Sequence, residues 1–453
     1  MLKEAVGYYH ELLEDEELSR KSVEQLASKM EEARLIFGGR RLSPYLRPHF
    51  VTESDWNRTA EICDTIFGTL QKVRDAAVES EELLNELGVT EAEKRLIEPD
   101  PGYQQAAATA RLDSFLTEDS YSYVELNGES PAGIAFSDSA RDIFLDLPVV
   151  RRFSEKYEIY GLEGRSRLLS TLLNCYEQFL GKPPESKPVI GIVDLKGLPT
   201  VQEFELCKEY FESNGYPAII CSPDELEFDG ESLKVNGRKL DIVYRRLLVR
   251  EYLPIIDQYP ALFDAYKAGA VCVANSYQSL LLHKKALFAV MTDERFAHLF
   301  DEAELAAIRR YVPWTRNFRE EKTRFYDQDI DLIEWTRENR DKLVLKPNDD
   351  YGGHGIYIGW ASDESEWNAA IEHALKTGDY LVQERVKTAK EPFPYVHEDG
   401  TVEMVTSMVD LDPLMFSGKT GSAFTRLSTS ELANVSSGGG MVPTIIIRGK
   451  KQT

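Results

Sequence analysis

The chain has 453 residues and a formal charge of −24, and because this length exceeds what one hydrophobic core usually serves, we expect two or three domains. The acidic balance argues against nucleic-acid binding, which depends on basic patches. Five cysteines without CxxC spacing indicate buried thiols in a reducing compartment. No run reaches the roughly 18 apolar residues of a membrane span, so we expect a cytoplasmic protein with no membrane partner.

The first 100 residues have a helical pattern. Ser22 precedes apolar residues at helical spacing, namely Val23, Leu26, Met30, Ala33 and Ile36. Pro99 and Pro101 close this segment. We interpret the apolar side chains as core and the segment as a helical N-terminal region.

Two polar segments in the next part favour a β-hairpin. Arg111–Asp113 and Glu125–Asn127 flank a polar turn over residues 117–122, a spacing that lets the two runs pair antiparallel. Residues i and i+2 share one strand face, so Arg111 is expected beside Asp113, and Glu125 beside Asn127. Two carboxylates and an amide suit Mg²⁺, and water and phosphate oxygens complete its coordination shell. Taken alone, the pair also fits a solvated hairpin of an acidic protein.

The pattern then changes to alternating helices and strands. An amphipathic helix around residues 168–176 ends at Gly181, before two prolines. The βαβ rhythm that follows predicts a parallel sheet with covering helices. Its predicted strands are residues 189–193, 218–221 and 241–244, and a predicted helix over residues 201–214 lies between the first two.

Charged residues follow two of these strands. Asp194 comes after the first strand, at the edge where open α/β sheets bind ligands. Arg245 and Arg246 follow the strand that ends at Tyr244. Arginine forks bind carboxylates bidentately, which makes this pair our candidate for a substrate carboxylate. Paired arginines more often form structural salt bridges, and that interpretation stays open.

A glycine-rich loop lies more than 200 residues after the hairpin. Residues 343–358 predict a strand ending in Lys346, a loop, and a returning strand. The loop glycines, Gly352, Gly353 and Gly355, let backbone N–H groups approach an anion. The lysine supplies a positive charge for phosphate oxygens. Strand rather than helix follows, which excludes a Walker loop or a dinucleotide fingerprint. An ordinary hairpin turn is the alternative, and His354 fits a loop surface better than a γ-phosphate contact.

The next predicted elements are a helix over residues 365–376 and a strand over residues 380–386. The helix has one apolar face, and Gly378 follows it. The strand passes into a polar turn at Gln383 and Glu384, a common way to present backbone amides to an adenine edge. An ordinary edge strand has the same pattern.

Taken in order, these motifs resemble the circularly permuted branch of the ATP-grasp superfamily, which includes glutathionylspermidine synthetase-like proteins. The hairpin matches the metal-binding stretch of that synthetase, and Lys346 with its glycines matches the phosphate loop. Lys285 resembles the second nucleotide lysine, and Gln383 and Glu384 occupy the hinge position. Residues 421–426 and 434–443 resemble the closing segments. Acidic residues in the run 348–350 and the lack of an amidase domain depart from the synthetase.

The resemblance implies a fold of the α/β (α+β) class with a circularly permuted ATP-grasp core. It divides the chain into four parts. These are a helical N-terminal region (1–100), the metal-ligand hairpin with a helical part of the core (101–187), a small Rossmann-like pre-ATP-grasp domain (188–280) and the nucleotide-binding lobes (281–453).

The resemblance also implies an ATP- and Mg²⁺-dependent carboxylate–amine ligase that acts through an acyl phosphate. Its partners are a small-molecule or peptide carboxylate and an amine. The expected ligands of ATP are Lys285, Lys346, Gly352, Gly353, Gly355, Gln383 and Glu384, and those of Mg²⁺ are Asp113, Glu125 and Asn127. Arg111 and Arg426 are expected to stabilise the transferring phosphoryl group. A catalytically silent nucleotide-binding regulatory protein and an ATP-grasp phosphotransferase are the alternatives. The sequence indicates neither the substrates nor an oligomeric state.

Overall fold

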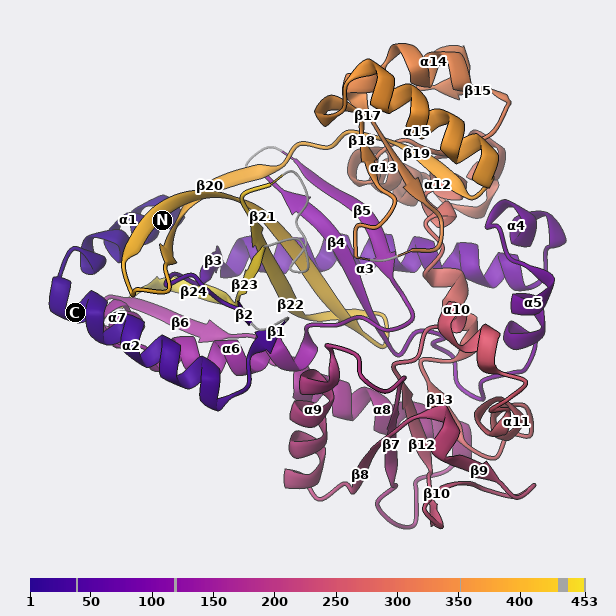
Figure 1. Ribbon diagram of the computed structural model, residues 1–453, viewed down its shortest axis with the longest axis horizontal. Coiled ribbons are helices and arrows are strands. Elements are labelled where there is room, and N and C mark those ends of the chain that lie inside the picture. The colour runs from indigo at the N-terminus through magenta and orange to yellow at the C-terminus, as the bar shows by residue number, and fades with distance from the viewer. Residues whose placement is uncertain (38–39, 118–119, 351, 431–438, 452–453) are drawn as a thin grey trace.

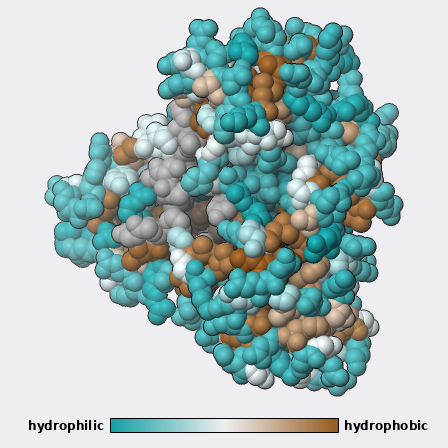
Figure 2. All heavy atoms as spheres, turned by 45° about the vertical axis from the view of Figure 1, so that its right-hand side comes forward, coloured by the Kyte–Doolittle hydropathy of each residue, from teal (hydrophilic) through white to brown (hydrophobic). Residues whose placement is uncertain are grey.

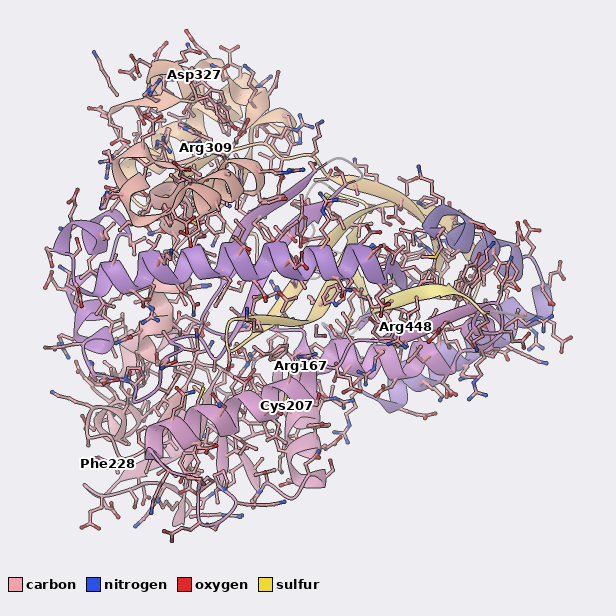
Figure 3. The ribbon with its side chains drawn as sticks, turned by 180° about the vertical axis from the view of Figure 1, so that it is seen from behind. Arg167, Cys207, Phe228, Arg309, Asp327 and Arg448 are labelled. Carbon is pink, nitrogen blue, oxygen red and sulfur yellow. The ribbon has the colours of Figure 1, made fainter. Side chains whose placement is uncertain are left out.

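The computed structural model describes residues 1–37, 40–117, 120–350, 352–430 and 439–451. Its largest sheet has six strands and joins the predicted hairpin to strands from the C-terminal part (Figure 1). The order is β23-β22-β21-β4-β5, and β20 also pairs with β21. The strands are β4 (Thr109–Leu116), β5 (Tyr121–Asn127), β20 (Ala389–Val396), β21 (Val402–Phe416), β22 (Lys419–Ser428) and β23 (Gly440–Val442). The long helix α3 (Glu53–Val78) crosses one face of this sheet, as the rear view shows (Figure 3).

The second sheet is parallel, with the order β13-β12-β7-β8. Alternate residues of its two central strands enter two different hydrophobic clusters, as expected of a sheet that is buried on both faces. The predicted strands and the helix between the first two differ from the observed bounds by no more than one residue. The elements are β7 (Ile190–Val193), α9 (Val201–Ser213), β8 (Ala218–Cys221), β12 (Ile242–Arg245) and β13 (Cys272–Ala274).

A third, antiparallel sheet holds the glycine-rich segment, in the order β14-β19-β17-β18. Helix α15 (Glu364–Thr377) packs on it through Trp367 and Ile371, starts at a capping box of Asp363 and ends at Gly378. The predicted helix is therefore confirmed. The strands are β14 (Thr315–Asn317), β17 (Leu343–Pro347), β18 (Tyr357–Ile358) and β19 (Tyr380–Glu384).

The N-terminal region is less purely helical than predicted. β3 (His49–Thr52) pairs in parallel with β24 (Thr444–Lys450), which also pairs with β6 (Tyr157–Gly161), so the two ends of the chain share one sheet. The predicted helix at Ser22 begins earlier, because the Asp15 side chain accepts from the N–H groups of Glu17 and Leu18. It ends at Glu32, which leaves Ala33 and Ile36 outside. Besides α3, the helices of this region are α1 (Leu2–Leu13), α2 (Glu16–Glu32), α4 (Glu81–Glu86) and α5 (Glu91–Ile97). The helices α6 (Ile134–Asp146) and α7 (Pro148–Ser154) follow the β4–β5 hairpin.

The remaining elements connect these layers. The helices are α8 (Gly164–Leu180), α10 (Val249–Tyr252), α11 (Ala261–Lys267), α12 (Ala286–Thr292), α13 (Glu302–Tyr311) and α14 (Leu332–Glu338). The strands are β1 (Ile36–Phe37), β2 (Arg40–Arg41), β9 (Leu226–Phe228), β10 (Leu233–Val235), β11 (Arg238–Lys239), β15 (Lys322–Phe325) and β16 (Gln328–Asp331). Across the described ranges, no helix has both the length and the apolar character needed to cross a bilayer. The face in Figure 2 is mainly hydrophilic, in keeping with the net charge.

Candidate active site

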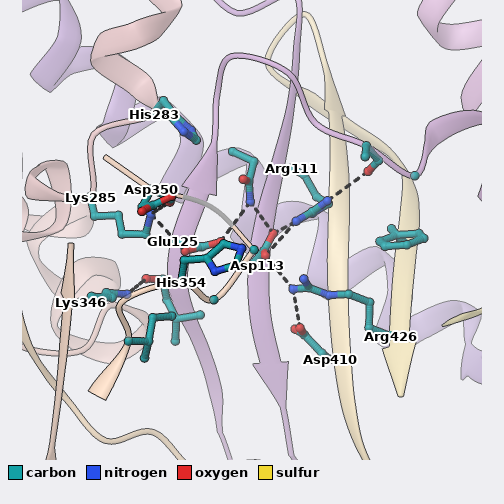
Figure 4. A pocket seen from close by; sticks show the side chains of 18 of the residues that line it. Arg111, Asp113, Glu125, His283, Lys285, Lys346, Asp350, His354, Asp410 and Arg426 are labelled. Carbon is teal, nitrogen blue, oxygen red and sulfur yellow. Dashed lines mark hydrogen bonds and ion pairs between the residues drawn. The ribbon is translucent and has the colours of Figure 1, made fainter. Parts of the chain in front are cut away.

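A cavity of about 1160 Å³ is bounded by the β4–β5 hairpin, the carboxyl edge of the parallel sheet and the glycine-rich loop (Figure 4). This volume slightly exceeds the roughly 300 to 1,000 Å³ of ordinary ligand pockets. Segments far apart in the sequence therefore meet at one site. The predicted residues that line the cavity are Arg111, Asp113, Glu125, Asn127, Arg246, Lys285, Lys346, Gly352, Gly353, Gln383, Glu384 and Arg426.

The hairpin has the predicted pairing. Asp113 lies opposite Glu125, and Arg111 lies opposite Asn127, because side chains alternate along each strand and the turn fixes the register. The amide of Asn127 donates to Asp113 Oδ1 at 3.0 Å and to Glu125 Oε1 at 3.3 Å. Glu125 Oε2 also lies 3.5 Å from Lys285 Nζ. Two carboxylates and a lysine thus share one wall.

Asp113 is held by two arginines. The Arg111 guanidinium donates to both of its oxygens, at 2.7 and 3.0 Å, and Arg426 Nη2 donates to Oδ2 at 2.6 Å. Burial by itself raises the pKa of Asp113, but the charges of Arg111 and Arg426 outweigh burial and lower it. Asp113 is therefore an ionised anchor for both guanidinium groups.

Two further carboxylates, Asp410 and Asp412, belong to this cluster. Arg426 Nη2 donates to Asp410 Oδ2 at 2.5 Å, and Arg426 Nε lies 2.9 Å from Asp412 Oδ2. Burial raises the pKa of both acids, and that of Asp412 rises strongly. Our sequence interpretation missed this pair. Its only signal is the Asp-x-Asp alternation within an apolar strand, which places both side chains on one face.

Lys346 is buried in the wall below the glycine-rich loop. Its ammonium donates to the carbonyl of Val124 at 2.6 Å and to Gln383 Oε1 at 2.8 Å. Burial lowers the pKa of Lys346 to about 7, although the charge of Glu125 acts in the opposite direction. Both of these acceptors are neutral, so neither supplies a full negative charge to the ammonium group.

The glycine-rich loop faces Lys285. Lys285 Nζ donates to the carbonyl of Asp350 at 2.5 Å. Gly352, Gly353 and Gly355 all have positive φ, which only glycine adopts without strain. Gly355 packs beside Pro347 and Tyr380 and is not among the residues that line the cavity, whereas His354 is.

The acidic run that departs from the synthetase has structural partners. Asp349 Oδ2 and Glu93 Oε1 accept from Lys284 Nζ at 2.8 and 2.7 Å. The Asn348 amide donates to the carbonyl of Leu87 and accepts from the N–H of Ala286. This loop is thus tied to the N-terminal helices and to α12, and sequence reasoning missed Lys284 as the link.

The backbone amides near Gln383 and Glu384 are not arranged as predicted for an adenine hinge. The N–H of Glu384 donates to the carbonyl of Trp314, and the N–H of Arg385 donates to that of Lys342, so neither points to a ligand. Gln383 bonds Lys346 and Thr315 instead. The cavity offers apolar contacts for a planar base here, from Val344, Ile356, Ile358, Trp360 and Val386.

The two arginines after β12 have separate environments. Arg245 does not line the cavity, because its guanidinium bonds Glu129 at 2.9 Å and the carbonyls of Leu247, Asn275 and Ser276, which favours the salt-bridge interpretation. Arg246 does line the cavity, and its buried Nε has no hydrogen-bond partner among the residues described. The neighbouring Asp194 faces the same space, and burial raises its pKa to about 6.

The donor atoms fit a magnesium ion only in part. Glu125 and Asn127 offer a carboxylate and an amide oxygen at the cavity, a set that suits Mg²⁺ when phosphates and water complete the shell. Both oxygens of Asp113 already accept from arginines, so it fits as their anchor rather than as a metal ligand. In the part of the chain that the structure describes, no three His, Cys, Asp or Glu side chains form a metal cluster.

Comparisons with known proteins identify the fold. No family model matches the chain. The glutathione synthetase-like effector GSS30 of Globodera pallida, in its apo form, superposes with a TM-score of 0.61 over 95% of this chain and 97% of that one, at 14% identity. The chain shares the fold of this effector.

A curated relative and a second solved structure are more distant. Glutamate–cysteine ligase 2-3 of Frankia alni is 27% identical over 222 residues, which are 47% of this chain. The match spans about a quarter (24%) of the length of that relative. A γ-glutamylcysteine synthetase structure from Methylobacillus flagellatus KT covers 85% of this chain and 86% of its own at 12% identity, and its TM-score of 0.38 is too low to carry an argument.

Proposed function

We propose that the chain is an ATP- and Mg²⁺-dependent carboxylate–amine ligase that acts through an acyl phosphate and has a circularly permuted ATP-grasp core. The observation that carries the proposal is the meeting of Lys285, Lys346 and Glu125 at one cavity. The names of the Frankia alni relative and of the Globodera pallida effector support a ligase of this class. The four-part division of the chain and a cytoplasmic location belong to the same proposal.

The nucleotide side of the cavity combines charge with apolar surface. Lys285 and Lys346 bind phosphate oxygens, and the glycines let the loop backbone approach them. The base packs against Ile356, Ile358 and Trp360. Glu125 and Asn127 would hold Mg²⁺, which would offset the charge that develops during phosphoryl transfer.

The substrate side lies toward the parallel sheet. The substrate carboxylate attacks the γ-phosphorus and the bond to ADP breaks; the amine then attacks the acyl carbon, and inorganic phosphate leaves. Arg111 and Arg426, fixed by Asp113, stabilise the negative charge of both steps. Arg246 binds a second carboxylate of a substrate, and Asp194 accepts the proton of the attacking amine.

Product analysis tests this function. The purified chain is incubated with ATP, Mg²⁺ and cell-extract metabolites, and mass spectrometry follows substrate-dependent ADP. A ligase forms an amide together with ADP and phosphate. A phosphorylated alcohol identifies a phosphotransferase, and nucleotide binding without turnover identifies a regulatory protein; either result overturns the ligase. Hydroxylamine in place of the amine should give an acyl hydroxamate together with ADP if an acyl phosphate forms, whereas an acyl adenylate would give the hydroxamate together with AMP.

A further inference from the structure

Two buried acids that have no part in the reaction proposed above, Asp410 and Asp412, surround the guanidinium group of Arg426. Asp410 lies opposite Arg426 in the pairing of β21 with β22, and Asp412 shares its strand face. Asp410 lines the cavity, whereas Asp412 is fully buried and is not among the lining residues. Asp412 Oδ1 accepts from the N–H of Ser114 at 3.3 Å, which ties the acid to β4.

The acids of this cluster hold two of the three nitrogens of Arg426. Nη2 donates to Asp113 at 2.6 Å and to Asp410 at 2.5 Å (Figure 4). Nε is buried and lies 2.9 Å from Asp412 Oδ2. Nη1 donates to no residue that the structure describes, and Arg426 lines the cavity. Nη1 is therefore the nitrogen that is left for an occupant of the cavity.

Arg111, the other arginine of the cluster, has a different set of contacts. Its Nε and Nη2 donate to the two oxygens of Asp113, and its Nη1 donates to the carbonyl of Ala132 at 3.1 Å. All three nitrogens thus donate within the protein. The two arginines therefore differ, because Arg426 offers a nitrogen to a ligand and Arg111 fixes Asp113.

The cluster contains more acid than an ion pair requires. Among the described residues, three carboxylates surround two guanidinium groups, and burial raises the pKa of both Asp410 and Asp412. One carboxylate is enough to neutralise Arg426, so the others add the cost of burying polar groups. Such costs are typical of functional sites, where supporting groups lock a side chain in one orientation.

Hydrogen bonds connect Arg426 to the residues proposed above for Mg²⁺ and phosphate. The amide of Asn127 joins Asp113 to Glu125, at 3.0 and 3.3 Å, and Lys285 Nζ lies 3.5 Å from Glu125. A phosphate held by Lys285 therefore lies on the same side of the hairpin as Arg426. Arginine and phosphate form short, charge-assisted hydrogen bonds.

We propose that Asp412 is a positioning residue that, together with Asp410 and Asp113, orients Arg426 so that its Nη1 donates to the terminal phosphate of the nucleotide. Arg111 acts through Asp113 and does not contact the nucleotide. The inference rests on the proposed function, because it takes the occupant of the cavity to be ATP.

Calorimetry with ATP and with ADP, both in the presence of Mg²⁺, tests the assignment, because ADP lacks the terminal phosphate. Asp412→Ala removes the acceptor beside Nε, and we expect ATP to bind about fivefold more weakly and ADP to bind as to wild type. Asp412→Asn keeps an acceptor oxygen and should restore ATP affinity to within about twofold. Asp64→Asn is the matched control, because Asp64 accepts from Thr420 at the start of β22 and does not line the cavity. It should leave both affinities unchanged.

Arg426→Lys shows whether Asp412 acts through Arg426. Lysine keeps a cation among the acids but lacks the fork of nitrogens, so ATP should bind about tenfold more weakly and ADP normally. The double variant of Asp412→Ala and Arg426→Lys should bind ATP no more weakly than Arg426→Lys alone. Arg426→Lys also tests the contact of Nη1 if Asp412→Ala does not fold.

Three results overturn the inference. They are wild-type ATP affinity in Asp412→Ala or Arg426→Lys, equal losses for ATP and ADP, and additive losses in the double variant. If the wild type binds neither nucleotide, the proposed function fails and the inference fails with it. If the wild type binds both and the variants do not separate them, only the inference fails.

Discussion

At the scale of single residues, Lys346 is the most informative side chain of the site. It is 5% exposed, and its two hydrogen-bond acceptors, the Val124 carbonyl and the Gln383 amide oxygen, carry no charge. Neutral acceptors compensate the burial of an ammonium group only in part. A phosphate supplies the missing negative charge, so protonation of Lys346 and nucleotide binding are expected to depend on each other.

Lys346→Met should weaken ATP binding by about 2 to 5 kcal/mol, because it removes a buried positive partner of phosphate oxygens and keeps the apolar stem. Lys342→Met, an exposed lysine four residues earlier that bonds Asn339, is the control and should bind like wild type. Isothermal calorimetry measures both. Unchanged affinity in a folded Lys346→Met protein would remove this lysine from the site.

ATP binding should take up a proton above about pH 7. The free protein has a Lys346 pKa of about 7, so at pH 8 the lysine is mostly neutral and gains a proton when phosphate binds. Affinity should therefore fall as pH rises through 7 to 9. At about pH 6 Lys346 is already protonated in the free protein, so it takes up no further proton when ATP binds. Calorimetry in buffers of different ionisation enthalpy counts the protons, and Lys346→Met should show none of this uptake.

At the scale of elements, the sequence predicted the hairpin, the parallel strands and α15 well because their signals are local. A period of two along β4 and β5 places Arg111 and Asp113 on one strand face and Glu125 and Asn127 on one strand face, and the turn, with a register shift between Asp113 and Ser114, pairs Asp113 with Glu125. The interactions of the hairpin side chains, in contrast, could not be predicted from the local sequence. Arg426 donates to Asp113 from a strand more than 300 residues later, so the local sequence could not indicate that this predicted metal ligand has a second arginine partner.

Glu125→Gln and Asp113→Asn should therefore act differently. Glu125→Gln should reduce turnover and alter the Mg²⁺ dependence, with little change in stability, since the carboxylate is partly exposed. Asp113→Asn removes the buried carboxylate that accepts from Arg111 at both oxygens and from Arg426 at one, and it should cost about 3 to 5 kcal/mol of stability.

Two measurements separate the effect on turnover from the effect on stability. The first is turnover as a function of Mg²⁺ concentration, and the second is chemical unfolding, with circular dichroism as the fold control. Equal loss of stability in both variants would make Glu125 a structural residue. Wild-type rates and metal curves in both would contradict the site as a whole.

At the scale of the whole molecule, the cavity wall that contains the glycine-rich loop is assembled from distant parts of the chain. The loop after β17 bonds the N-terminal helices through Asn348 and Leu87, and Lys284 joins Glu93 of α5 to Asp349 of the loop. No role could be predicted for the acidic run of this loop, because its partners lie about 60 to 260 residues away in the chain. The helical region that lacked a recognisable motif thus supports the glycine-rich loop.

Lys284→Met should loosen this connection. The change leaves Glu93 and Asp349 buried without their shared cation, which typically costs about 3 to 5 kcal/mol. Because the loss is local, amide hydrogen exchange is the appropriate measurement, and we expect faster exchange in residues 81–97 and 343–350 than elsewhere. Lys72→Met removes an exposed ion pair with Glu304 and should change exchange little. If residues 81–97 exchange as in wild type while Lys284→Met stays folded, the N-terminal helices do not depend on this network. ATP affinity should fall together with protection of the loop, because Lys285 and Lys346 are positioned around it.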